Sequence, residues 1–268
     1  MTHTVYQIPI CPFSQRVHIL ATLKGIPDEL QLVDVDITIP RPAHILKLSR
    51  GTTALPVMEI EGGRALKESM VLMDYIEDKF NDTPIRRKDS YERAIENLMV
   101  NTLESNFVNS GYGLVLNADK SKREACVKKY LDAHEKINDF LLHYGTDDGS
   151  PWMFDRFGWV EAVFTPFFQR WWFVEYYEDV HLPENDEKFN RVIEWRNACV
   201  EHPMAQQVEK EEIIKIYYDY SKGASNGGVP SGRTRSSCSF LPHWRERPMP
   251  PNGDKYGPSV SDEELGLL

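Results

Sequence analysis

The chain has 268 residues, of which 41% are hydrophobic and 27% are charged, and its formal net charge is −10. This length allows two small domains, each with its own core. The acidic balance argues against nucleic acid and anionic membranes as main partners. No apolar run approaches the roughly 20 residues of a membrane span, and residues 1–30 lack the apolar segment of a signal peptide. We therefore expect a cytoplasmic protein that does not associate with membranes.

Cysteine and histidine spacing argues against metal sites and disulfides. The four cysteines, at positions 11, 126, 199 and 238, form neither a CxxC pair nor a zinc-binding pattern. The eight histidines include no HxxxH or HExxH pair. There is no Walker or GxSxG motif. We expect reduced cysteines, no metal and no nucleotide.

The strongest chemical signal is the stretch from Ile8 to Arg16. The apolar run 5–10 predicts a buried strand, and a helical pattern begins directly after Cys11. Free N–H groups and the positive end of a helix dipole stabilise an anion at such a junction, so Cys11 is predicted to be a reactive thiolate. Pro12 fits the first helical turn. Arg16 either adds positive charge or points to solvent, and an inert buried cysteine is the alternative reading of Cys11.

The first 80 residues or so alternate strands and helices. A strand pattern follows at 30–37, and Ser69 is a good N-cap for a later helix. The full predicted order is β-α-β-α-β-β-α, with later elements at 43–48 (helix), 57–60 and 64–67 (a hairpin) and 69–80 (helix). Residues 83–90 are polar and carry no periodicity, so we take 1–82 as one domain and 83–90 as a linker.

From residue 91 strand signals nearly vanish, and 91–222 is predicted to be an all-helical domain. A helix from Gly158 to about Tyr177 is apolar nearly all round, which is typical of a domain core, and Pro166 is predicted to bend it. Two more helices are predicted at 189–200 and 209–220. His134 lies on an apolar stripe and is predicted to be a core histidine.

Residues 223–268 are rich in Pro, Ser and Gly and poor in large apolar residues. This segment is predicted to be an extended C-terminal tail, either draped on the helical domain or partly disordered. Phe240 and Trp244 are candidates to anchor it.

This organisation resembles the cytosolic glutathione transferases, in which a thioredoxin-like domain precedes an all-α domain. Cys-Pro-Phe-Ser-Gln-Arg (11–16) is similar to the omega-type, cysteine-containing branch. Further segments resemble the glutathione-removing (deglutathionylating) lyases of bacterial lignin β-aryl-ether degradation: GTTALP (51–56), LKESMV (66–71), DRFGW (155–159), YYED (176–179), YYDY (217–220), RPMPP (247–251) and ELGL (264–267).

The resemblance implies a glutathione site, with glutathione as co-substrate and Cys11 as nucleophile. Leu55 is expected to precede a cis-Pro56 and to pair its backbone with glutathione like an added strand. Glu68 is expected to meet the γ-glutamyl ammonium group, and Ser69 with the helix N-terminus its carboxylate. Arg41 is expected to reach the glycyl carboxylate, or else to be a solvated loop charge. Phe13 is assigned to the same site.

The electrophile's pocket is expected between the two domains, above Cys11. Candidates to line it are Tyr217, Tyr218, Trp171 and Trp172, although core packing is the alternative role for each. A phenol near the thiolate can hydrogen-bond a departing enolate oxygen.

The activity implied by the resemblance is removal of glutathione from an α-glutathionyl aromatic ketone through a Cys11–glutathione mixed disulfide. Glutathione and the glutathionylated ketone are then the partners, and a homodimer is possible. The alternatives are a dehydroascorbate reductase or thioltransferase of omega type, a chloride intracellular channel-like protein that associates with membranes, and a glutathione-binding fold without catalysis.

Overall fold

The computed structural model describes residues 3–268. Its first half is built on a four-stranded mixed sheet in the order β2-β1-β3-β4. The central strand β1 pairs in parallel with β2 and antiparallel with β3, and β3 pairs antiparallel with β4. The strands are β1 (His3–Gln7), β2 (Leu30–Asp34), β3 (Val57–Ile60) and β4 (Arg64–Lys67).

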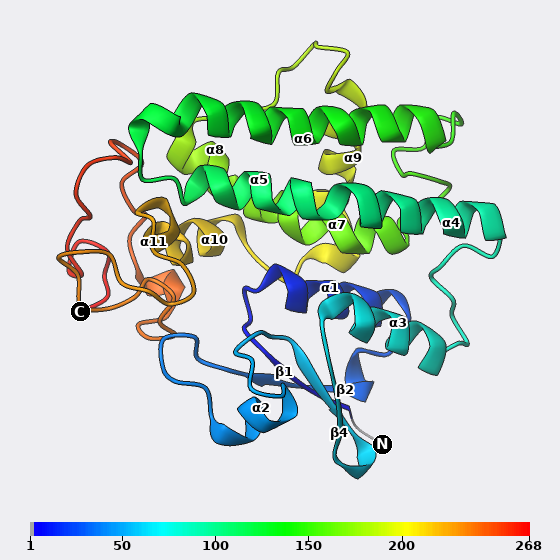
Figure 1. Ribbon diagram of the computed structural model, residues 1–268, viewed down its shortest axis with the longest axis horizontal. Helices are drawn as coiled ribbons and strands as arrows, with labels where there is room; N and C mark the ends of the chain where they lie inside the picture. Colours follow the sequence, from blue (N-terminus) through cyan, green and yellow to red (C-terminus); the bar gives the residue numbers. More distant parts are fainter. Residues whose placement is uncertain (1–2) are drawn as a thin grey trace.

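Helices cover both faces of this sheet (Figure 1). The helices α1 (Pro12–Leu23) and α3 (Ser69–Lys79) lie between the sheet and the helical half, and the short α2 (Ala43–Leu48) lies on the opposite face. The strand and helix order predicted from the sequence is confirmed. Strand β1 ends at Gln7, earlier than predicted, because the chain turns at Ile8–Cys11, where the Cys11 N–H donates to the Ile8 carbonyl at 2.9 Å.

The second half is helical. Its helices are α4 (Ser90–Met99), α5 (Ser105–Val115), α6 (Arg123–Tyr144), α7 (Trp159–Arg170), α8 (Trp172–Glu178), α9 (Asn190–Glu201), α10 (Lys210–Ile216) and α11 (Tyr218–Ser221). A π-helical turn, Val100–Glu104, joins α4 to α5 without leaving helical backbone angles. Such turns often accompany functional sites, because they re-aim side chains along a helix.

Helix α7 is the centre of the helical half, and every one of its residues is buried. The prediction of a single helix to Tyr177 was wrong: α7 ends at Arg170, and α8 begins after Trp171. The helix continues through Pro166, because packing on all sides outweighs the backbone hydrogen bond that proline cannot make. His134 is fully buried beside α7, with Nδ1 2.8 Å from the Tyr130 carbonyl, so its predicted core position is confirmed.

The predicted helix 209–220 is also divided in two. Backbone angles at Tyr217 (φ −88°, ψ 11°) interrupt it between α10 and α11. The interruption sends neighbouring tyrosines in different directions: Tyr217 lines a cavity, and the Tyr218 hydroxyl accepts the Val260 N–H at 3.0 Å.

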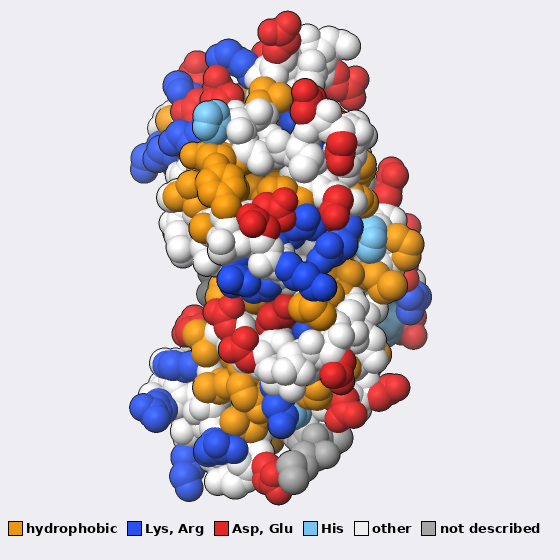
Figure 2. Space-filling model, turned by 90° about the vertical axis from the view of Figure 1, so that its right-hand side faces the viewer, with side chains coloured by type: hydrophobic (Ala, Val, Ile, Leu, Met, Phe, Trp, Pro, Cys, Tyr) orange, Lys and Arg blue, Asp and Glu red, His pale blue; other side chains and the backbone are white. Residues whose placement is uncertain are grey.

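The connection between α3 and α4 is held by ion pairs to both halves. Arg86 lies 3.6 Å from Asp74 of α3 and 3.5 Å from Glu96 of α4. Arg87 lies 2.7 Å from Glu92. Figure 2 shows Lys and Arg side chains in a band across the middle of one face, with Asp and Glu side chains on either side of it.

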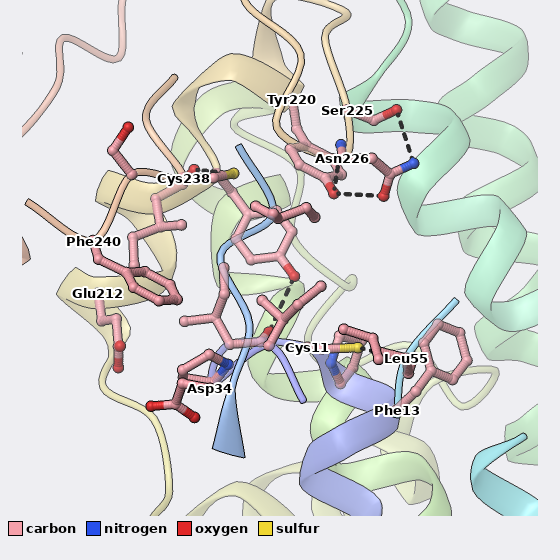
Figure 3. Close-up of a pocket in the computed structure, with 18 of the residues that line it drawn as sticks. Cys11, Phe13, Asp34, Leu55, Glu212, Tyr220, Ser225, Asn226, Cys238 and Phe240 are labelled. Atoms are coloured by element: carbon pink, nitrogen blue, oxygen red, sulfur yellow. Dashed lines mark hydrogen bonds between the residues drawn. The ribbon is translucent and has the colours of Figure 1, made fainter. Parts of the chain in front are cut away.

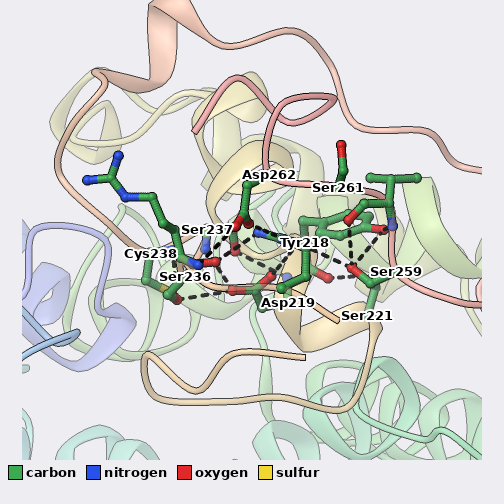
Figure 4. A network of polar contacts seen from close by, with 12 residues as sticks. Tyr218, Asp219, Ser221, Ser236, Ser237, Cys238, Ser259, Ser261 and Asp262 are labelled. Carbon is green, nitrogen blue, oxygen red and sulfur yellow. Dashed lines mark hydrogen bonds and ion pairs between the residues drawn. The ribbon is translucent and has the colours of Figure 1, made fainter. Parts of the chain in front are cut away.

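The tail, residues 223–268, lies against the helical half rather than away from it. A buried ion cluster, here called the latch, holds the tail in place. In the latch, Arg233 of the tail pairs with Asp219 of α11 and with Asp262 (Figure 4). Asp219 also accepts the Ser237 N–H at 2.7 Å and the Ser236 hydroxyl at 3.0 Å. Trp244 is buried, as expected of an anchor, whereas Phe240 is 40% exposed and does not serve as one.

Among residues 3–268, no helix is both long and apolar enough to cross a bilayer. No group of three or more His, Cys, Asp and Glu side chains in that range is arranged to hold a metal ion.

Candidate active site

Cys11 occupies the N-cap of α1, at the junction predicted from the sequence. The Ser14 and Gln15 N–H groups donate to its carbonyl at 3.1 and 3.0 Å, and Pro12 takes the first helical position. Its side chain is half-buried, with Sγ 3.9 Å from the Leu55 carbonyl. The sulfur therefore lies at the positive end of a helix dipole and faces open space.

The loop opposite Cys11 contains the Leu55–Pro56 peptide bond, which is cis, as the resemblance implied. Leu55 and the two residues before it, Thr53 and Ala54, line the same cavity as Cys11. Backbone groups of an irregular loop are therefore presented next to the thiol.

A cavity of about 970 Å³ opens above Cys11, and both halves of the molecule line it (Figure 3). The sheet half contributes Phe13, Asp34 and Arg41 besides the Cys11 turn. The tail supplies one side, here called the tail wall, made of Cys238, Ser239, Phe240, His243, Trp244 and Arg247. A site of this size between two halves of a chain holds a substantial organic ligand.

Three tyrosines form the part of the cavity nearest the helical core. The Tyr112 and Tyr217 hydroxyls are 3.4 Å apart, and the Tyr217 and Tyr220 rings are 4.7 Å apart between centroids. Burial raises the pKa of all three phenols, and the positive charge of Arg170 partly opposes this at Tyr217. At neutral pH they are therefore protonated hydrogen-bond donors.

Arg16 does not point to solvent. Its guanidinium is buried and donates to the Val163 carbonyl at 2.9 Å, to the Ser69 hydroxyl at 3.2 Å and to Glu104 at 2.6 Å. Burial lowers the pKa of Arg16, while the negative charge of Glu104 and, to a lesser degree, of Cys11 opposes the shift. The π-helical turn that carries Glu104 thus supplies the counter-charge of Arg16.

Glu68 and Ser69 lie at the start of α3 and are not among the residues that line the cavity. Glu68 has positive φ (71°), is exposed, and makes no side-chain hydrogen bond or ion pair with any residue in the described range 3–268. Ser69 is buried, and its hydroxyl accepts from Arg16. Arg16 therefore connects the Cys11 helix to this pair.

Arg41 lines the cavity and is not a freely solvated charge. Its Nη1 donates to the Asp36 carbonyl at 2.9 Å, and its Nε donates to the Thr53 carbonyl at 3.3 Å. Burial lowers the pKa of this guanidinium, with the charge of Asp36 opposing the change.

Of the four aromatic candidates for the pocket, the structure brings only Tyr217 to the cavity in the described part of the chain. Trp171 is 1% exposed and packs edge-on against Phe107, because Gly111 of α5 leaves room for its ring. Trp172 is packed against the core. The Tyr218 hydroxyl is directed at the tail, where it accepts the Val260 N–H.

Sequence reasoning missed Tyr112, Tyr220 and the tail wall. No local pattern marks them, since Tyr112 comes from α5 and the tail wall from a segment with no helical or strand periodicity. The Pro-rich composition of the tail predicted an extended segment, draped on the helical domain or partly disordered, but it did not indicate which tail residues line the cavity.

Comparison with known proteins links the chain to glutathione transferases. Residues 10–79 match the glutathione S-transferase N-terminal domain family. Glutathione S-transferase L1 of Arabidopsis thaliana is 28% identical over 169 residues, which cover 63% of this chain and 66% of that relative. The chain therefore spans just under two thirds of that relative's length.

Solved structures match over most of the fold. Glutathione transferase Omega 3C from Trametes versicolor superimposes with a TM-score of 0.66 at 19% identity, covering 78% of this chain and 89% of that one. Rice GST1, solved in complex with glutathione, gives a TM-score of 0.65 at 18% identity, covering 79% of this chain and 92% of that one. The fold is shared, and about a fifth of this chain has no counterpart in either structure.

Proposed function

We propose that this protein is a cysteine-dependent glutathione transferase that removes glutathione from α-glutathionyl aromatic ketones. The match of residues 10–79 to the glutathione S-transferase N-terminal domain family supports this proposal. The observation that carries the proposal is the position of Cys11, at a helix N-terminus and open to a cavity of about 970 Å³. A serine or tyrosine at this point only activates the thiol of glutathione, whereas a cysteine thiolate can itself attack sulfur.

Glutathione fits the surroundings of Cys11. Arg41, Phe13 and the Leu55–Pro56 loop hold its glycyl and cysteinyl parts beside the thiol, where the Leu55 backbone pairs with it like an added strand. The γ-glutamyl end reaches the start of α3. There the exposed Glu68 carboxylate meets its ammonium group, and Ser69 with the α3 N-terminus meets its carboxylate.

The chemistry proceeds in two sulfur exchanges. The Cys11 thiolate attacks the glutathionyl sulfur, a sulfur–sulfur bond forms, and the carbon–sulfur bond breaks. The carbon leaves with the electron pair as an enolate, which takes a proton to become the ketone. A second glutathione thiolate then attacks the Cys11–glutathione disulfide, which frees Cys11 and releases glutathione disulfide. Glutathione is thus the reductant of the carbon–sulfur bond.

Tyr217 is the pocket residue suited to the leaving enolate. It lines the cavity together with Cys11, and its hydroxyl now donates to the Ile10 carbonyl at 3.3 Å. A phenol that burial keeps protonated can donate to an oxygen on which negative charge develops. The tail wall, with Phe240 and Trp244, lines the same cavity and offers an apolar surface to the aryl group.

The test is mass spectrometry of the protein mixed with phenacyl-glutathione, with and without excess glutathione. We expect released ketone and a glutathione adduct on Cys11 that free glutathione removes. Cys11→Ser should abolish turnover, whereas the matched control Cys126→Ser, a half-buried cysteine outside the cavity, should retain it. An intact thioether with an unmodified Cys11 would refute the proposal, and turnover of dehydroascorbate instead would support the reductase alternative.

A further inference from the structure

Arg170, at the end of α7, is a buried cation directly beneath the Cys11 turn. It is fully buried, and two of its nitrogens donate to the Ile10 carbonyl, Nε at 3.2 Å and Nη2 at 2.6 Å. Its Nη1 donates to Gln15 Oε1 and to the Pro166 carbonyl. The guanidinium therefore holds the Ile10–Cys11 peptide unit through hydrogen bonds to its carbonyl.

The acceptors of Arg170 are all uncharged. Among residues 3–268, no carboxylate lies within ion-pair distance of its guanidinium. The Gln15 side-chain nitrogen in turn donates to the side-chain oxygens of Gln169, at 2.6 Å, and Gln207, at 3.1 Å. Both of these side chains are also neutral. A buried charge is costly unless an opposite charge compensates it, so this site favours an anion nearby.

The other charged and titratable groups around Cys11 do not neutralise the positive charge of Arg170. Arg16 of α1 is neutralised by Glu104. Tyr112, Tyr217 and Tyr220 are protonated at neutral pH, because burial raises the pKa of each. The remaining charged groups that line the cavity are Asp34, Arg41, Glu212, His243 and Arg247.

Glu212 is the carboxylate of the cavity that senses Arg170. Burial raises the pKa of Glu212, and the charge of Arg170 is among the influences that lower it. The two side chains are nevertheless not an ion pair, since they are more than 4 Å apart. Within residues 3–268, no carboxylate therefore pairs with Arg170 to neutralise its positive charge.

We infer that Arg170 is a positioning residue that holds the Ile10–Cys11 peptide in place and acts as the buried counter-charge of the Cys11 thiolate. The inference rests on the proposed function only in taking Cys11 as the reacting group. It assigns a role in the reaction to a residue of α7 that touches neither the sulfur nor the cavity.

The same contact frees Tyr217 for the substrate. A carbonyl oxygen has two lone pairs, and the Ile10 oxygen receives three donors, of which the Tyr217 hydroxyl, at 3.3 Å, is the most distant. When Tyr217 turns toward an enolate, Arg170 keeps the Ile10 carbonyl satisfied. The Cys11 turn then does not move as the phenol changes partner.

The experiment measures alkylation of Cys11 by iodoacetamide between pH 5 and 9, in the intact protein, with site-specific mass spectrometry. We expect Arg170→Gln to raise the pH at which half of Cys11 reacts by about one unit, which lowers the alkylation rate about tenfold at pH values well below that midpoint. Arg170→Lys, which retains the charge, should recover most of this loss. Arg170→Met replaces the Gln variant if that variant does not fold.

The matched control is Arg191→Gln. Arg191 also donates to backbone carbonyls, at 2.9 Å to Pro151 and 2.7 Å to Trp152, but it belongs to α9 and does not line the cavity. Its pH profile should equal that of the unmodified protein. An unchanged profile in Arg170→Gln, or an equal loss in Arg170→Gln and Arg170→Lys, would overturn the counter-charge role. Because the assay contains neither glutathione nor ketone, it succeeds or fails independently of the proposed turnover.

Discussion

Two buried arginines, Arg233 in the tail and Arg170 under the Cys11 turn, are held by opposite kinds of partner. Arg233 lies between two buried carboxylates, Asp219 and Asp262, whereas Arg170 contacts carbonyl and amide oxygens alone within the described residues. The positive charge of Arg233 is thus fully compensated by carboxylates, and the latch serves to hold the tail. The Arg170 site keeps a net positive charge, which an anion formed during a reaction can use.

The largest effect is expected from Arg233→Met. The substitution leaves Asp219 and Asp262 buried without their cation, so the free energy of unfolding should fall by about 3–5 kcal/mol. Urea denaturation measures this loss, and limited proteolysis with peptide mapping should show new cleavage within 223–268. A loss below about 1 kcal/mol, with an uncut tail, would mean that the latch does not hold the tail.

A smaller loss of stability is expected from Arg170→Met. The substitution removes hydrogen bonds to neutral acceptors but leaves no carboxylate without a partner, so we expect about 1–3 kcal/mol. The same urea titration measures it, and the ratio to the Arg233→Met value is the informative quantity. Equal losses in the two variants would contradict the contrast between the sites.

The smallest effect is expected from Arg245→Ala. Arg245 lies 2.5 Å from Glu209, but both side chains are more than half exposed. Surface ion pairs contribute about 0–1 kcal/mol, and salt screens them. The urea midpoint should therefore change little, and raising the salt concentration should remove what difference exists. A loss comparable to that of Arg233→Met would show that burial is not what separates these arginines.

Much of the sheet half follows from local sequence. The Cys11 junction, the start of α3 and the 57–67 hairpin each depend on a few neighbouring residues, and the structure has all three. The N-cap prediction for Ser69 was wrong: the N-cap is Glu68, and Ser69 is the first helical residue, with its hydroxyl accepting from Arg16. Glu161, three residues after Gly158, is a further local feature: it caps its own helix entry by accepting the Gly158 N–H at 3.0 Å. Propensity and capping act over a few residues, so a single sequence reveals them.

The parts that could not be predicted depend on distant segments. Arg170 is 160 positions from Ile10 along the chain, and nothing near Arg170 indicates that its guanidinium grips the Cys11 turn. Tyr217 and Tyr218 are adjacent tyrosines that only the helix interruption separates into a cavity residue and a tail contact. Aromatic side chains are common in ligand-binding pockets, but the Trp171 ring instead fills the space that Gly111 leaves in the core.

The tail wall also has a consequence for the order of synthesis. The thiol at Cys11 leaves the ribosome before the tail wall, which extends to Arg247. At translation rates of about 5–20 residues per second, roughly 10–50 s pass between these two points. During this interval a nascent chain presents its nucleophile without the side of the cavity that later encloses it, so the thiol meets cellular electrophiles before it can select among them.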